Sequence, residues 1–102
     1  MPGIWNSTPL DRASFHGYAD IVEMLLARDP DPPLAYRNQF GGTPLQACIH
    51  GFFHGWNSGH PQDHARTLEL LLGAGATYEL SALPTGDDAL DAVLRARPDR
   101  AV

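Results

Sequence analysis

The chain has 102 residues, which is enough for one domain with a modest hydrophobic core. Its formal net charge of −5 disfavours binding to nucleic acid, so partners are expected to present neutral or basic surfaces. A single cysteine excludes an intramolecular disulfide, and no apolar run approaches the ~20 residues of a membrane span. We therefore expect a cytoplasmic protein that does not contact membranes.

The same helix start occurs twice. Thr8 is a favourable N-cap and Pro9 suits the first helical position, where its missing N–H costs nothing. Thr43 and Pro44 repeat this arrangement, and Gln46 there completes a capping-box pattern. Each copy therefore predicts the first helix of a structural unit.

An apolar stripe follows each helix start. Gly17 is expected to end the first helix and to separate it from a second one. The second helix of the first unit has four apolar residues at helical spacing, Ile21, Val22, Leu25 and Leu26. The corresponding leucines of the second unit are Leu70, Leu71 and Leu72. Gly75 is expected to end that helix in a left-handed conformation.

The second unit carries an insertion. Its first helix is expected from Pro44 to about Phe52, and its second helix cannot begin before Pro61 or Asp63. The expected loop between them lies at about 52–62, and loops of this length in compact domains are functional or disordered. Its large aromatic residues make disorder less favourable.

The C-terminal part predicts an abbreviated unit. Leu80 to Leu83 is expected to form one turn, and Thr85 is expected to cap a final helix with Asp87 and Asp88 in its first turn. Pro98 is expected to end this helix. Its buried stripe is Leu90, Val93 and Leu94.

The T-P-L start, the glycine nine positions later and the I-V-x-x-L-L finish resemble an ankyrin repeat, whose period is about 33 residues. The resemblance implies an all-α fold, an ankyrin-repeat α-solenoid forming a single domain over residues 1–102. Repeat 1 would span about 4–36, repeat 2 about 37–77 with the insertion at about 52–62, and a partial capping repeat about 78–97. Leu34 to Gly42 would form a protruding finger between the two repeats.

The same resemblance implies binding to another protein through the concave face and the finger loops, without enzymatic activity. The expected contact residues lie on finger tips, first-helix ends and the insertion: Trp5, Ser7, Phe15, His16, Gln39, Phe40, His50, Phe53 and Trp56. Aromatic side chains are favoured anchors at protein interfaces, although these rings could equally pack the fingers and the insertion onto the helices. A second hypothesis is a homodimer formed through the uncapped N-terminal repeat.

Histidines are the only residues whose spacing suggests a metal. Two pairs are four residues apart, His50 with His54 and His60 with His64. On a helix each pair could share a zinc ion, but Gly51, Gly55 and Pro61 disfavour helical geometry. We therefore expect solvated loop histidines and no metal or cofactor, with a metal-binding site at this histidine-containing loop as the less favoured alternative.

No pattern indicates catalysis. Ser58 lacks the flanking glycine spacing of a nucleophile elbow, and no paired acid and base is evident. Cys48 falls beside small-residue positions of a helix, so we expect a buried, inert thiol there. The sequence thus predicts no catalytic residue.

Overall fold

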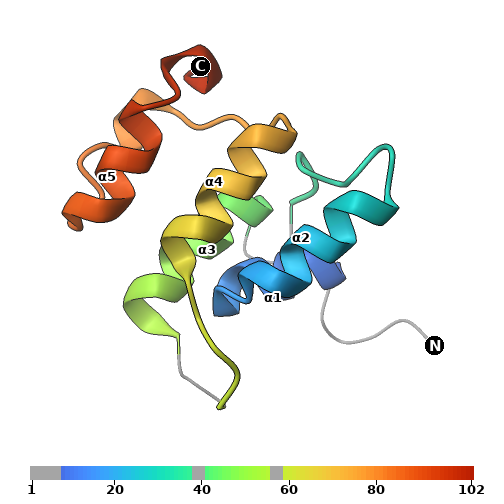
Figure 1. The fold of residues 1–102 in the computed structure, drawn as a ribbon. Helices are drawn as coiled ribbons and strands as arrows, with labels where there is room; N and C mark the ends of the chain where they lie inside the picture. Colours follow the sequence, from blue (N-terminus) through green and yellow to red (C-terminus); the bar gives the residue numbers. More distant parts are fainter. Residues whose placement is uncertain (1–7, 38–40, 56–58) are drawn as a thin grey trace.

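The computed structural model describes residues 8–37, 41–55 and 59–102, which are helical apart from their connections and one isolated β-bridge (Figure 1). The α-helices are α1 (Pro9–His16), α2 (Ala19–Arg28), α3 (Pro44–His54), α4 (His64–Ala74) and α5 (Asp88–Arg95). Two 3₁₀-helices follow, η1 (Leu80–Ala82) and η2 (Pro98–Arg100). α1 packs against α3 in one layer, α2 against α4 in the other, and α5 against α4.

Both predicted helix starts are confirmed. The Thr8 hydroxyl accepts a hydrogen bond from the Asp11 N–H at 3.1 Å, and Pro9 occupies the first turn. At α3 the capping box is complete, because the Thr43 hydroxyl accepts from the Gln46 N–H while the Gln46 side chain accepts from the Thr43 N–H. Each cap satisfies backbone donors that a helix N-terminus otherwise leaves unpaired.

The predicted glycine stops are also confirmed. Gly17 ends α1 with φ 70°, and Gly75 ends α4 with φ 116°, a left-handed conformation that L side chains rarely adopt. The turn after Gly17 is short enough for α2 to begin at Ala19. α1 and α2 therefore pack directly against each other.

The boundaries around the insertion differ from the prediction. α3 continues past Phe52 to His54, so residues 52–54 are helical, and the described part of the connection to α4 consists of residues 55 and 59–63. α4 begins at His64, in agreement with the expected start near Asp63. The Asp63 carboxylate caps this helix by accepting from the Arg66 N–H at 3.0 Å. The described part of the expected finger has a turn at Leu34 and Ala35 and a bend at Gly41, and its residues 38–40 lie outside the described ranges.

The predicted cap of the final helix is wrong by two residues. Asp87, not Thr85, is the N-cap of α5, and its carboxylate accepts from the Leu90 N–H at 3.0 Å. Thr85 is engaged elsewhere, because its N–H and its hydroxyl both donate to the Asp91 carboxylate. These hydrogen bonds from Thr85 hold the pKa of Asp91 below its ordinary value. Two good capping residues compete here, and the contact of Thr85 with Asp91, six residues later in α5, leaves Asp87 as the cap.

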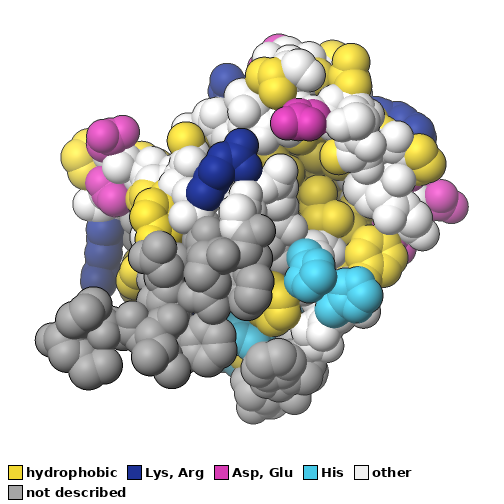
Figure 2. Space-filling view, turned by 180° about the vertical axis from the view of Figure 1, so that it is seen from behind, with side chains coloured by type: hydrophobic (Ala, Val, Ile, Leu, Met, Phe, Trp, Pro, Cys, Tyr) yellow, Lys and Arg dark blue, Asp and Glu magenta, His cyan; other side chains and the backbone are white. Residues whose placement is uncertain are grey.

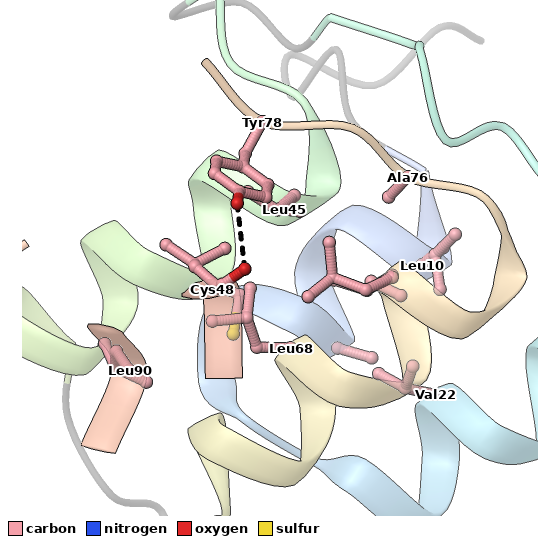
Figure 3. Close-up of a cluster of buried hydrophobic side chains, with 12 residues drawn as sticks. Leu10, Val22, Leu45, Cys48, Leu68, Ala76, Tyr78 and Leu90 are labelled. Atoms are coloured by element: carbon pink, nitrogen blue, oxygen red, sulfur yellow. Dashed lines mark hydrogen bonds between the residues drawn. The ribbon is translucent and has the colours of Figure 1, made fainter. Parts of the chain in front are cut away.

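The hydrophobic core runs through both layers and reaches α5 (Figure 3). Its fully buried leucines are Leu45, Leu68, Leu71, Leu72, Leu90 and Leu94. Ile21, Leu25 and Leu26 of the predicted α2 stripe are only partly buried, whereas Val22 is fully buried. Because α4 contacts α2, α3 and α5, it is the central helix of the core.

The C-terminal segment folds back onto the connection after α4. Tyr78 is buried and donates its hydroxyl proton to the Leu94 carbonyl at 2.8 Å, which ties α5 to this connection (Figure 3). The Tyr78 N–H donates to the Arg100 carbonyl, and the Arg100 Nε donates to the Leu72 carbonyl. The C-terminal end of α5 and the segment after it are therefore tied to α4 and to the connection that follows α4. Within the described ranges, no helix has the length and apolarity needed to cross a membrane.

Candidate functional site

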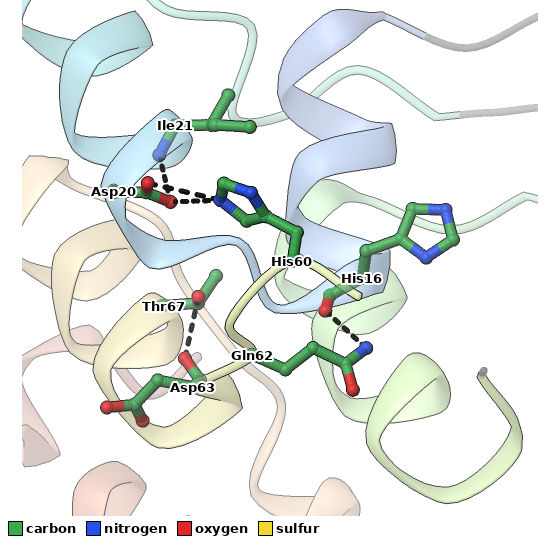
Figure 4. A network of polar contacts seen from close by, with 7 residues as sticks. All are labelled: His16, Asp20, Ile21, His60, Gln62, Asp63 and Thr67. Carbon is green, nitrogen blue, oxygen red and sulfur yellow. Dashed lines mark hydrogen bonds and ion pairs between the residues drawn. The ribbon is translucent and has the colours of Figure 1, made fainter. Parts of the chain in front are cut away.

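The end of the insertion is fastened to the C-terminal end of α1. The Gln62 side chain donates to the His16 carbonyl at 2.8 Å (Figure 4). The Asp63 N–H donates to the Gly17 carbonyl at 2.7 Å. Carbonyls in the last turn of a helix have no partner within that helix. We call residues 62–64 the strap. They supply such partners although they lie 46 or more positions after these carbonyls in the sequence.

The third residue of the strap, His64, is buried between α1 and α3. Its Nε2 lies 3.0 Å from the Phe15 carbonyl, which can only accept, so the ring proton sits on Nε2. The ring also fills the space beside Gly17, where a Cβ atom would lie 2.6 Å from it. The expectation of a solvated loop histidine is therefore wrong for His64, which is a packed and hydrogen-bonded helix residue.

His64→Ala should lower the free energy of unfolding by about 2–3 kcal/mol, because it leaves a cavity and a carbonyl without its donor. His60→Ala is the matched control, because His60 is half-buried and its loss should cost less than about 1 kcal/mol. Urea denaturation followed by circular dichroism measures both. Equal losses in the two variants would contradict the structural role of His64.

His60 connects the insertion to the start of α2. Its Nε2 lies 3.0 and 3.1 Å from the two carboxylate oxygens of Asp20, which also accepts from the Ile21 N–H (Figure 4). The hydrogen bond from His60 holds the pKa of Asp20 below its ordinary value. Asp20 is exposed, so this pair fixes the position of the loop more than it stabilises the fold.

Six side chains form a continuous row of ring contacts across the ends of α1 and α3 and the loop. In order along the row they are His54, His50, Phe15, His16, Tyr18 and His60. Neighbouring ring centroids lie 4.6 to 6.0 Å apart, within the range of favourable aromatic contacts. We call this row the ring cluster. Figure 2, seen from behind the view of Figure 1, shows histidine side chains beside hydrophobic ones on this side of the molecule.

The ring cluster contains three of the predicted contact residues, Phe15, His16 and His50. Phe53, a fourth, lies three residues after His50 on α3, is 44% exposed and meets Phe52 edge-on at 5.0 Å. Its ring also lies close to Gly86 in the loop before α5. The remaining predicted residues, Trp5, Ser7, Gln39, Phe40 and Trp56, lie outside the described residues.

A hollow of about 390 Å³ lies between the C-terminal end of α3 and the strap. It is lined by Gly51, Phe52, Gly55, Gln62, Asp63, His64 and Ala65. In the part of the chain that the structure describes, no three histidine, cysteine or acidic side chains converge. The hollow therefore has no three-ligand metal centre among these residues.

Cys48 is buried, as predicted. Its thiol donates to the His64 carbonyl at 3.3 Å, and burial raises its pKa well above the ordinary value. A thiolate is the reactive form of cysteine, so this thiol is chemically inert. Its role is to pack α3 against the start of α4.

Sequence reasoning missed the strap and the ionic contact of His60. Asp63 carries a recognisable signal, since an aspartate before a helix favours an N-cap. Gln62 and His64 carry none, because their partners are carbonyl groups of α1, and any residue has a carbonyl. Such contacts become visible only when the fold brings the segments together.

One family model matches the chain, that of the ankyrin repeat, over residues 5–37, which contain α1 and α2. The match does not extend to α3, α4 or α5. No curated protein and no solved structure matches the chain.

Proposed function

Because this chain is an ankyrin repeat protein, with its matched repeat at residues 5–37, we propose that it binds a partner protein through the side formed by α1 and α3. Ankyrin repeats generally mediate protein–protein interaction and are typically non-enzymatic. The observation that carries the proposal is the ring cluster, which places Phe15, His16 and His50 together on that side.

We also interpret the helix pairs as a short solenoid. In this interpretation α1 and α2 belong to a repeat at about 4–36, α3 and α4 to a second at about 37–77, and α5 to a partial capping repeat at about 78–97. The support is that both pairs begin with the same Thr-Pro cap and that equivalent helices share a layer. The second repeat then carries its insertion at the strap end of the helix pair.

The chemistry of this side favours a partner with neutral or basic character. The chain carries a net charge of −5, so a basic partner is attracted and an acidic one repelled. Half-exposed aromatic rings provide large contact areas at low entropic cost, which is why they anchor many interfaces. Phe53 on α3 is the most exposed aromatic predicted for this surface in the described ranges.

Phe53→Ala should weaken partner capture about tenfold or more, the loss typical of an aromatic anchor. Met24→Ala is the control, because Met24 is equally exposed at 44% but lies on α2, in the opposite layer. Wild type and both variants serve as baits in parallel, with captured proteins quantified by mass spectrometry. Equal capture by Phe53→Ala and wild type would contradict the proposed surface.

Self-association is distinguished on the same preparations by size-exclusion chromatography with light scattering. A homodimer that persists on dilution and is disrupted by Phe53→Ala would identify the partner as a second copy of the chain. A monomer, together with partner capture that depends on Phe53, would support binding to a different protein.

A further inference from the structure

The two histidines at the end of α3 stand on one face of a regular helix. His50 and His54 are four residues apart, and α3 continues through Gly51 to His54. The Gly55 N–H still donates to the Gly51 carbonyl at 2.8 Å, so the glycines do not interrupt the helix there. Residues four apart on a helix project side by side, and both imidazoles are exposed. The geometric objection to a metal site at this pair therefore does not hold.

The two rings are spaced as a single ion would space them. Their centroids lie 4.6 Å apart, with the ring planes inclined by 36°. Metal–nitrogen bonds of about 2.0–2.1 Å, with ring centres about 1.1 Å behind the nitrogens, place two ring centres roughly 4.5–5.3 Å apart for bond angles of about 90–110°. The spacing of the two ring centres is therefore within the range that a shared ion requires.

Among the described residues, these two imidazoles make ring contacts, His50 with Phe15 and the two histidines with each other. In the described part of the chain, neither His50 nor His54 forms a hydrogen bond or ion pair. The other metal-binding side chains nearby are engaged, since His60 is held by a carboxylate of α2 and His64 by a carbonyl of α1. Cys48 is buried and its thiol already donates a hydrogen bond. The pair at the end of α3 is therefore the accessible one.

We propose that His50 and His54 form a bidentate chelate for one Cu²⁺ or Zn²⁺ ion. The described residues bring no third histidine, cysteine or acidic side chain to such a cluster, so water fills the remaining positions. Imidazole suits both ions, and Cu²⁺ binds a given site more tightly than Zn²⁺. The site follows from the geometry of α3 and does not depend on the proposed partner surface.

Calorimetric titration of the full chain, without a polyhistidine tag, with CuCl₂ and with ZnCl₂ tests the proposal. We expect one ion per chain, with Cu²⁺ bound more tightly. Even the loss of a residue that only supports a ligand weakens metal binding by roughly tenfold or more, so His54→Ala and His50→Ala should each weaken binding by at least that factor. His60→Ala, the matched control, should bind as wild type does.

Thermal unfolding without metal verifies that the histidine variants are folded, as expected from the exposure of His50 and His54. Absence of binding for both ions would overturn the proposal. Unchanged binding by His54→Ala would also overturn it, and so would an equal loss in His60→Ala.

Discussion

Gly51→Ala should destabilise the protein by at least about 3 kcal/mol, a large part of the stability of a domain of this size. A Cβ atom on residue 51 would lie 1.7 Å from the carbonyl oxygen of Phe15. The carbonyl belongs to the backbone of α1 and a Cβ atom is fixed rigidly to the backbone of α3, so the two helices must separate to make room. That separation would loosen the principal contact between the two helix pairs in this layer. Chemical denaturation monitored by circular dichroism measures the loss.

Gly73→Ala is the matched control and should have the opposite sign. Gly73 also lies inside a helix, α4, but nothing surrounds its position within 4 Å. Alanine is the better helix former, so the variant should gain up to about 1 kcal/mol. A similar effect of alanine at both glycines would contradict the claim that residue 51 must be glycine because α1 approaches α3 there.

Leu71→Ala should cost about 2–5 kcal/mol, the range for truncating a fully buried leucine. Leu71 is 0% exposed and lies on α4, which contacts α2, α3 and α5. The cavity would therefore open inside the core, on its central helix. The shift of the urea midpoint at constant slope measures the cost.

Leu80→Ala makes the same chemical change at a surface position. Leu80 is 63% exposed in η1, so its truncation should stay within about 0.5 kcal/mol. The contrast between the two leucines tests whether α4 is the centre of the core. Comparable losses at both positions would contradict the described packing.

The elements that local chemistry determines were predictable from the sequence. Thr8 and Thr43 cap backbone groups three residues away, so the signal and its target lie in one short stretch. The same holds for Gly17 and Gly75, whose left-handed conformations end their helices. The helical fold and the limits of α1, α2 and α4 follow from such local signals.

The elements that depend on contacts outside a short capping pattern were not predictable. Gly51 was counted against helical geometry at the histidine pair, yet it is needed inside α3 because the backbone of α1 passes against it. Thr85 was the expected cap of α5, but Asp91 engages it and Asp87 takes its place. In each case the partner belongs to another segment or another turn, which composition and spacing do not reveal.

The candidate site was likewise predictable in part. Phe15, His16 and His50 were selected by their positions in the repeat pattern, and the structure brings their rings into one row. The helical setting of the His50 and His54 pair was missed, because glycine propensity argued against it. Whether these residues bind a partner or an ion stays a prediction that the binding experiments decide.

The strap has a consequence for dissecting the molecule. The last carbonyls of α1 receive their donors from residues 62–64, so a fragment cut before the insertion would lose these donors. The N-terminal helix pair is thus not an independent module. Deletion or grafting experiments must retain the chain at least through α4, and hydrogen exchange should find α1 and α4 opening together rather than one after the other.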